Sequence, residues 1–194
     1  MTIRTLALLT AATIGLAACG HSTSTASNTS TDTTMTADTN ATTGNDMNAA
    51  APVPSGGQTF VNTAAASDAF EIATSKLALD QSKSASVKSF AKEMIKAHTG
   101  STGKLKTITA GLTPPLTPDP TLTSDQQSTL DGLKAKTGSD FDTAYASAQV
   151  AAHQAALDGL KSYGATGDVP QLKDFANGLV PIVTAHLNMA KALK

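Results

Sequence analysis

The stretch LVPIVTAHLNMAKAL (residues 179–193) places apolar residues at the spacing of an α-helix. On a helical projection of about 100° per residue, its apolar side chains and those of the preceding segment form one stripe. The stripe consists of Leu172, Phe175, Ala176, Leu179, Ile182, Val183, Ala190 and Leu193. The pattern predicts an amphipathic helix over 169–193, with His186 near the middle of its apolar face. A half-polar imidazole on that face requires a hydrogen-bond partner, a metal ion or another ligand.

Three other long segments carry a similar apolar stripe, of the width expected for helices that pack in a bundle. Their predicted ranges are 59–81, 85–109 and 140–163, and a short helix is predicted over 124–136. Residue types that commonly cap helix N-termini stand at several of these boundaries. The predicted caps are Ser84, Ser139, and either Thr123 or Ser124.

The proline-rich segment GLTPPLTPDP (111–120) separates the long helices into two pairs. Such a segment favours a stiff, extended connection. The second helix of each pair opens on related residues, VKSFAKEM (87–94) and LKDFANGL (172–179). Two related hairpins joined by a long crossover is the architecture of ferritin-like bundles. The sequence therefore predicts an all-α, ferritin-like four-helix bundle of two antiparallel hairpins over 59–194, with one short extra helix.

The N-terminus, MTIRTLALLTAATIGLAACG (1–20), has the form of an export signal. Its apolar run from Leu6 to Ala18 follows Arg4 and is too short for a transmembrane helix. The run ends in LAAC, which resembles the bacterial lipobox and implies cleavage before Cys19 and acylation of Cys19. We therefore expect a signal peptide over 1–18 and a lipid anchor in the bacterial cell envelope. Gly20, in the place of an inner-membrane-retaining Asp, favours the outer membrane.

Residues 19–58 contain almost no bulky apolar side chains, so this segment cannot offset the entropy lost on ordering. We expect a disordered tether that spans about 35 Å and holds the domain in the periplasm. His21 lies in this segment and is not expected to take part in a site.

Composition argues against several classes of function. The net charge is −1 and Arg4 is the only arginine, so the basic patch of a nucleic-acid-binding protein is missing. Cys19 is the only cysteine, which excludes an intrachain disulfide and Cys-based metal motifs. Only two glutamates occur, Glu71 and Glu93, and no histidine has Glu three residues before it. A carboxylate-rich di-iron centre is therefore not expected. No Gly-x-Ser-x-Gly motif occurs either, so we expect no enzyme.

Each long helix carries one potential metal ligand on or near its inward face. These residues are Glu71, His98, His153 and His186. Together they form a plausible set for zinc, copper or iron. The competing interpretation is structural: Glu71 and His98, predicted at the same level of the bundle, would pair and satisfy each other. Counted from their predicted loop, His153 and His186 are offset by roughly 10 Å, which weighs against a joint site.

The predicted bundle resembles the bacterial domain of unknown function 4142 family. The matching segments are FVNTAAASDAFEIATSKLAL, VKSFAKEMIKAH, GSDFDTAYASAQVAAHQAAL and LKDFANGLVPIVTAHLNMAKAL. The resemblance implies a ferritin-like four-helix bundle that is exported and often lipid-anchored, and it implies no particular activity. Family members often carry an acidic residue just before the histidines, where this chain has Ala97, Ala152 and Ala185.

From the sequence we expect a lipid-anchored periplasmic bundle of binding or envelope-maintenance type, without catalysis and without a nucleic-acid partner. The sequence does not identify a protein partner. The alternative is a metal-binding protein that uses Glu71 and the three histidines of the bundle.

Overall fold

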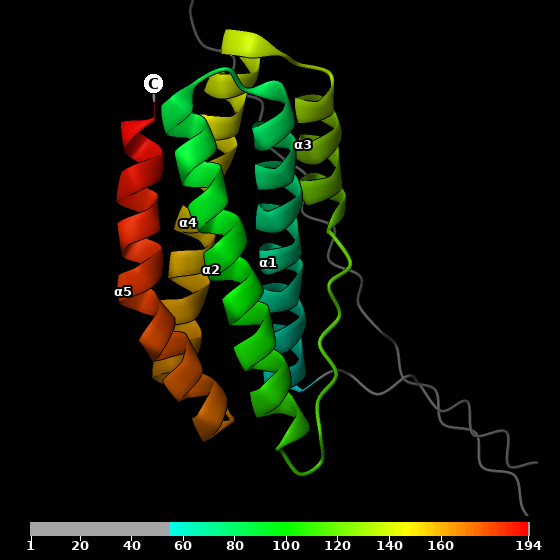
Figure 1. Cartoon of the computed structure of the whole chain (residues 1–194). Helices are drawn as coiled ribbons and strands as arrows, with labels where there is room; N and C mark the ends of the chain where they lie inside the picture. Colours follow the sequence, from blue (N-terminus) through cyan, green and yellow to red (C-terminus); the bar gives the residue numbers. More distant parts are fainter. Residues whose placement is uncertain (1–54, 194) are drawn as a thin grey trace, which may run out of the picture. The chain divides into compact units, whose positions relative to one another are not determined.

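The computed structural model describes residues 55–193, which form five α-helices (Figure 1). The predicted signal peptide, Cys19, His21 and the predicted tether up to residue 54 lie outside the described residues. The helices are α1 (Gly56–Gln81), α2 (Ala85–Ala110), α3 (Ser124–Lys134), α4 (Gly138–Thr166) and α5 (Pro170–Ala192). Residues 55–193 contain no β-strand, which agrees with the predicted all-α class. None of these helices combines the length and the apolar character needed to cross a membrane.

The four long helices form a bundle of two antiparallel hairpins, α1–α2 and α4–α5 (Figure 1). The hairpins pack against each other through α1 with α4 and through α2 with α5. The segment between α2 and α3 runs back along the bundle, and α3 packs against α1 and α4. This long connection allows α2 and α4 to run in the same direction, as in the predicted ferritin-like topology. The predicted hairpins, crossover and short extra helix are all present.

Local signals placed most helix starts correctly. The side chain of Ser84 accepts a hydrogen bond from the Val87 N–H and caps α2, as predicted. Thr123 caps α3 in a reciprocal capping box with Gln126. The first helix begins at Gly56 rather than 59, because Ser55 caps it through the Gln58 N–H. Residues 56–58, which the sequence predicts to belong to the tether, are therefore helical.

The predicted cap at Ser139 is wrong. The fourth helix begins at Gly138, two residues before the predicted start at 140, and Thr137 precedes it without a side-chain cap. Gly138 has a φ of +59°, in the left-handed region that glycine adopts at low cost, and this conformation turns the chain into the helix. Ser139 consequently lies inside α4, where its carbonyl accepts a hydrogen bond from Thr143 Oγ1.

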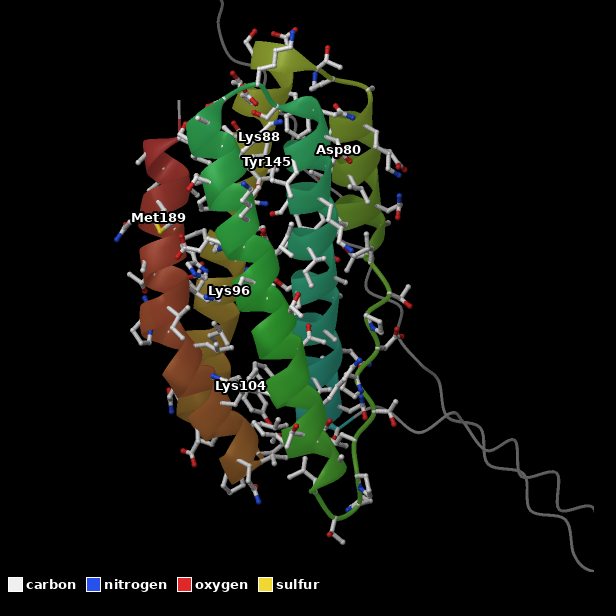
Figure 2. All side chains as sticks on the ribbon, viewed as in Figure 1. Asp80, Lys88, Lys96, Lys104, Tyr145 and Met189 are labelled. Atoms are coloured by element: carbon white, nitrogen blue, oxygen red, sulfur yellow. The ribbon has the colours of Figure 1, made fainter. Side chains whose placement is uncertain are left out.

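The end of the bundle near the α1–α2 loop has a tightly filled apolar core, which we call the closed end. Its buried residues are Ala78, Val87, Phe90, Ala91, Met94, Leu133, Phe141, Tyr145 and Ala190. In Figure 2, Tyr145 lies between the helices, whereas the exposed Lys96 and Lys104 lie on the outer side of α2. Adjacent to the closed end, the core changes character and becomes polar.

Candidate metal centre

Three histidines from three different helices meet in the interior of the bundle. His98 comes from α2, His153 from α4 and His186 from α5, and all three are buried. Their ring centroids are 5.6–6.0 Å apart. One ring nitrogen of each residue lies within 4.8 Å of those of the other two. The structure thus brings together three of the four ligand candidates that the sequence indicated.

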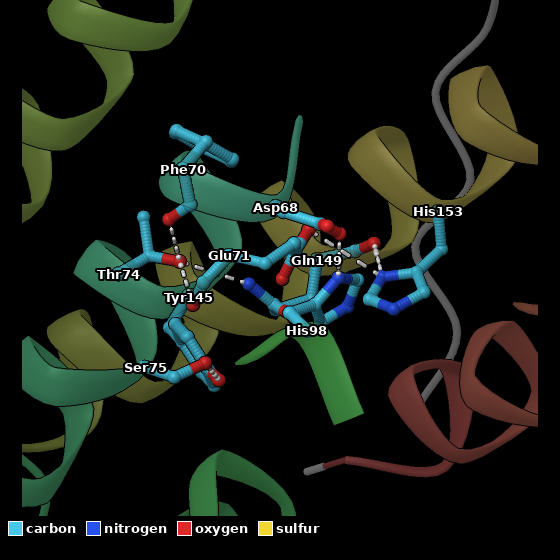
Figure 3. A network of polar contacts seen from close by, with 9 residues as sticks. All are labelled: Asp68, Phe70, Glu71, Thr74, Ser75, His98, Tyr145, Gln149 and His153. Atoms are coloured by element: carbon cyan, nitrogen blue, oxygen red, sulfur yellow. Dashed lines mark hydrogen bonds and ion pairs between the residues drawn. The ribbon is translucent and has the colours of Figure 1, made fainter. Parts of the chain in front are cut away.

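Two of the histidines are held by hydrogen bonds through Nδ1 (Figure 3). His98 Nδ1 lies 2.8 Å from Asp68 Oδ1, and Asp68 Oδ2 accepts a second bond of 3.0 Å from Thr102 Oγ1. His153 Nδ1 lies 2.8 Å from the backbone carbonyl oxygen of Gln149. A carbonyl or carboxylate oxygen accepts, so Nδ1 carries the proton in both rings. The lone pair of each neutral ring is therefore on Nε2.

Three buried ring nitrogens have no hydrogen-bond partner. They are His98 Nε2, His153 Nε2 and His186 Nδ1. Leaving a buried polar atom without a partner typically costs about 1–3 kcal/mol. Metal-binding histidines characteristically have one nitrogen fixed by a carboxylate or carbonyl and the other free for the ion. His98 and His153 both show this arrangement.

The spacing of the nitrogens is close to that of a metal site. A tetrahedral ion with bonds of about 2.0–2.1 Å holds its nitrogen ligands roughly 3.3 Å apart. One ring nitrogen of each histidine lies within 4.8 Å of the other two, so these atoms need an inward shift on the order of 1 Å or less each.

The electrostatics favour neutral rings at two of the three positions. Burial lowers the pKa of His153 to about 4, with further lowering by the charges of His98 and His186 and partial opposition from the bond to the Gln149 carbonyl. Burial also lowers the pKa of His186. For His98, burial acts downward, but Asp68 and Glu71 outweigh it and raise the pKa. Two of the rings are thus ready to bind a cation at neutral pH, and the third is fixed by a carboxylate.

The predicted pairing of Glu71 with His98 is wrong. The carboxylate on His98 belongs to Asp68, one turn earlier in α1. Glu71 Oε1 instead lies 3.6 Å from Nδ1 of His153, the nitrogen that already donates to Gln149. Neither oxygen of Glu71 has a hydrogen-bond partner, and burial raises its pKa to about 7 against the opposing effects of His98 and Gln149. The structure therefore places Glu71 beside the cluster rather than among the three nitrogens.

The predicted axial offset between His153 and His186 is also wrong. The two rings lie 5.6 Å apart because the turn between their helices lies later in the chain than predicted. The fourth helix continues to Thr166 and the fifth begins at Pro170. Measured from this turn, the two histidines are level to within about one helical turn.

Sequence reasoning assigned no site role to Asp68, Gln149 or Thr102. Each lies one turn from a candidate: Asp68 precedes Glu71 by three residues, Gln149 precedes His153 by four, and Thr102 follows His98 by four. Residues three or four apart share a helix face, so this spacing was an available signal for the supporting shell. The side chain of Gln149 also donates a bond of 3.1 Å to Thr74 Oγ1, which extends the buried polar network into α1 (Figure 3).

Comparison with known proteins identifies the family and agrees with the fold. The sequence matches the family described as a domain of unknown function, DUF4142, over residues 41–193, and the chain belongs to this family. No curated protein sequence matches it.

Two solved structures are similar in fold. The first is CopM in the Cu(II)-bound form, with a TM-score of 0.57, 16% identity, and coverage of 69% of this chain and 92% of that chain. The second is CopM in the Cu(I)-bound form, with a TM-score of 0.54, 18% identity, and coverage of 72% and 94%. At this level of identity the likeness concerns the helical-bundle fold alone.

Proposed function

We propose that this DUF4142 domain binds a transition-metal ion, copper foremost, through His98, His153 and His186, and that it acts by binding rather than by catalysis. The observation that carries the proposal is the convergence of three buried imidazoles whose remaining nitrogens have no partner. The rings come from three helices, so only the folded bundle assembles the set.

A purely structural role accounts poorly for these contacts. A structural histidine in a core satisfies its ring nitrogens with neighbouring groups. Here the bonds to Asp68 and Gln149 fix two rings, yet the opposite nitrogens of both rings have no hydrogen-bond partner. Unpartnered ring nitrogens gain nothing from each other, whereas a metal cation would satisfy one nitrogen of each ring together.

The donor chemistry favours copper or zinc over harder ions. Imidazole nitrogen is a ligand for zinc, copper, iron and nickel, and Cu²⁺ has the highest affinity among the first-row divalent ions. The cluster contains no carboxylate ligand, which argues against magnesium, calcium and manganese. CopM, which is similar in fold and is known in Cu(II)-bound and Cu(I)-bound forms, supports copper as the first ion to test.

We also propose that the domain is tethered to the outer membrane through acylated Cys19 and lies in the periplasm. This part rests on the sequence of residues 1–20 alone. The Cys19→Ser variant should leave the membrane fraction or remain unprocessed. A mature Cys19→Ser protein that still sediments with membranes would refute the anchor.

The metal proposal is tested by thermal unfolding of protein purified without a polyhistidine tag. Melting is recorded with a chelator and then with Cu²⁺, Cu⁺ and Zn²⁺ in turn. A bound ion stabilises only the folded state, so at about 100 times Kd the gain is about 2.7 kcal/mol. We expect this metal-dependent rise in wild type and its loss in His98→Ala, His153→Ala and His186→Ala.

The matched control is His21→Ala, which removes the one histidine outside the bundle and should retain the full metal effect. Titration of metal into protein that has been freed of metal with a chelator should also give one bound ion per chain. If no ion shifts the melting temperature of wild type, or if the shift survives in all three core variants, the proposed site is wrong.

A further inference from the structure

A largely apolar cavity of about 290 Å³ lies next to the histidine cluster, between the two hairpins. Its wall includes Phe60 and Phe70 from α1, Leu160 from α4, and Leu179 and Val183 from α5. Small residues from facing helices complete the lining, and their lack of volume is what leaves the space open. Ile182, which is 42% exposed, also lines the cavity and is the only exposed large hydrophobic side chain in residues 55–193.

The ionisable side chains in the lining are those of Asp68, His98 and His186, whereas His153 does not line the cavity. The other polar residues of the lining are Thr63, Ser67, Ser101 and Gln126. His98 and His186 are 8% and 6% exposed, and each has a ring nitrogen without a partner. Both oxygens of Asp68 are engaged, one by His98 and the other by Thr102. Among the ionisable side chains of the lining, the polar atoms without a hydrogen-bond partner are therefore imidazole nitrogens.

We infer that the metal ion keeps one coordination position open towards this cavity, and that the cavity receives the apolar body of a small molecule that donates a nitrogen or sulfur atom to the ion. This inference rests on the proposed metal site. It assigns the protein a second ligand, beyond the metal itself.

The coordination count supports this step. Zinc sites with three protein ligands take their fourth from water or an external molecule. Within the described residues, the two carboxylates nearest the cluster are not placed to complete it. Glu71 faces the Nδ1 side of His153, and Asp68 is held by its two hydrogen bonds. No other side chain in residues 55–193 joins the three histidines as a ligand, and the cavity is lined by two of them.

The size and lining of the cavity define the chemical class of this ligand. An apolar cavity of about 150 Å³ holds one benzene molecule, so about 290 Å³ has room for one or two rings. The apolar wall offers few hydrogen-bond partners, so a ligand with several polar groups would lose its hydration without compensation. A ligand with a single donor atom on an apolar body satisfies both requirements. Its donor atom binds the ion, and its body packs against the aromatic and aliphatic side chains.

The experiment compares 4-phenylimidazole with imidazole on the copper-loaded full chain. Both probes present the same donor, and only the first has an apolar body. Binding is followed by the change in the visible and electron paramagnetic resonance spectra of Cu²⁺. Burial of the phenyl ring should make 4-phenylimidazole bind about tenfold or more tightly than imidazole.

Cavity-filling variants make the comparison specific. Ala156→Leu and Gly159→Leu both add volume to the lining from α4, and a Cβ at Gly159 would meet no atom within 4 Å. Each should bind copper as wild type does but lose the preference for 4-phenylimidazole. Ala165→Leu, in the same helix but outside the cavity, should keep the preference.

The outcomes separate the two proposals. A chain that binds no copper refutes the metal site and this inference together. A chain that binds copper but shows equal affinity for the two probes refutes only the cavity ligand. A preference that persists in both filled variants, or that needs no copper, also refutes it.

Discussion

The closed end of the bundle and the adjacent histidine layer, which contains His98, His153 and His186, are built from the same long helices. They differ in how densely they are packed and in whether their polar atoms have partners. At the closed end, Phe141, Tyr145 and Met94 are completely buried and fill the space between the helices. The one polar atom of Tyr145 is satisfied there, because its hydroxyl lies 2.8 Å from Ser75 Oγ. In the histidine layer, small residues leave a cavity and three ring nitrogens have no partner.

This contrast indicates a division of labour along the bundle, in which one region provides stability and the other forms the candidate site. Dense apolar packing with satisfied polar atoms gives stability, whereas voids and unpaired polar atoms reduce it. Proteins tolerate such local violations mainly where a site requires them. The closed end therefore holds the helices in register, and the histidine layer uses that register to hold its side chains near a common point.

The largest effect on stability should come from the closed end. Phe141 is fully buried and stacks on Tyr145 with ring centroids 5.8 Å apart. Phe141→Ala removes this side chain and leaves a void, so it should lower the free energy of unfolding by about 3–5 kcal/mol. Denaturant unfolding of the metal-free protein measures the loss.

The comparison variant is Ile182→Ala at the cavity. The Ile182 side chain is 42% exposed, so this truncation should change the free energy of unfolding by about 0.5 kcal/mol or less. Similar losses in the two variants would contradict the proposed division of labour.

The sequence predicted the bundle well because its signals are local or periodic. Apolar spacing, the proline-rich crossover and caps such as Ser84 and Thr123 are all readable without knowledge of the partner helix. Three of the four candidate ligands also meet as a set, because His98, His153 and His186 lie on inward faces. The periodicity of apolar residues predicts on which face of a helix each residue lies.

The details of the site depended on quantities that periodicity does not supply. A shift of about three residues in the α4–α5 turn moves His186 along the bundle by roughly 4.5 Å, which was enough to hide its contact with His153. The choice between Asp68 and Glu71 as the partner of His98 depends on a rotation within one helix face. Glu71 and Asp68 are one turn apart, so the pattern alone could not distinguish them.

The next prediction concerns the support of the site rather than its ligands. Asp68 fixes the ring of His98 through a bond of 2.8 Å and lies on a different helix from it. Loss of such a supporting group typically weakens metal binding about 10–100-fold. Asp68→Ala should therefore retain the ion but bind it more weakly by that factor, as measured in competition with a chelator of known affinity.

Asp158→Ala serves as the control for this measurement. Asp158 is an exposed residue of α4 whose carboxylate accepts hydrogen bonds from the Gln154 side chain rather than from a histidine of the cluster. Its removal should leave metal affinity unchanged. Equal affinities for Asp68→Ala and wild type would mean that the histidine ring is oriented by packing alone.

The pH dependence of stability sharpens the comparison further, because the histidine layer contains Glu71, a fully buried carboxyl group whose two oxygens have no hydrogen-bond partner. Burial raises the pKa of Glu71 from its ordinary value of 4.5 to about 7. A raised pKa in the folded state means that its stabilising contribution is present below pH 4.5 and is lost as pH rises through 7. His153, with a pKa lowered to about 4, acts in the opposite sense as pH falls below 6.5.

Substitution of Glu71 isolates the first contribution. Glu71→Gln keeps the shape and removes the ionisation, so at pH 8 the metal-free variant should be more stable than wild type by about 3 kcal/mol. The difference should shrink as the pH falls from 7 to 4.5. Denaturant unfolding at several pH values, with chelator present, gives the two curves. Parallel curves across this range would show that Glu71 does not titrate in the folded protein.

The smallest expected effect tests whether the cavity is open space in solution. Gly159 lies inside α4 and lines the cavity, and a Cβ built on it meets no atom within 4 Å. Alanine is favoured over glycine in a helix interior by up to about 1 kcal/mol, so Gly159→Ala should stabilise the metal-free domain by about 0.5–1 kcal/mol.

Gly164 in the same helix offers the opposite case, because a Cβ there would collide with the side chain of Asn177 on α5. Gly164→Ala should therefore destabilise the domain despite the same gain in helix propensity. If both variants lose stability, the helices close over the space at Gly159, and the contrast between a filled end and a hollow layer does not hold in solution.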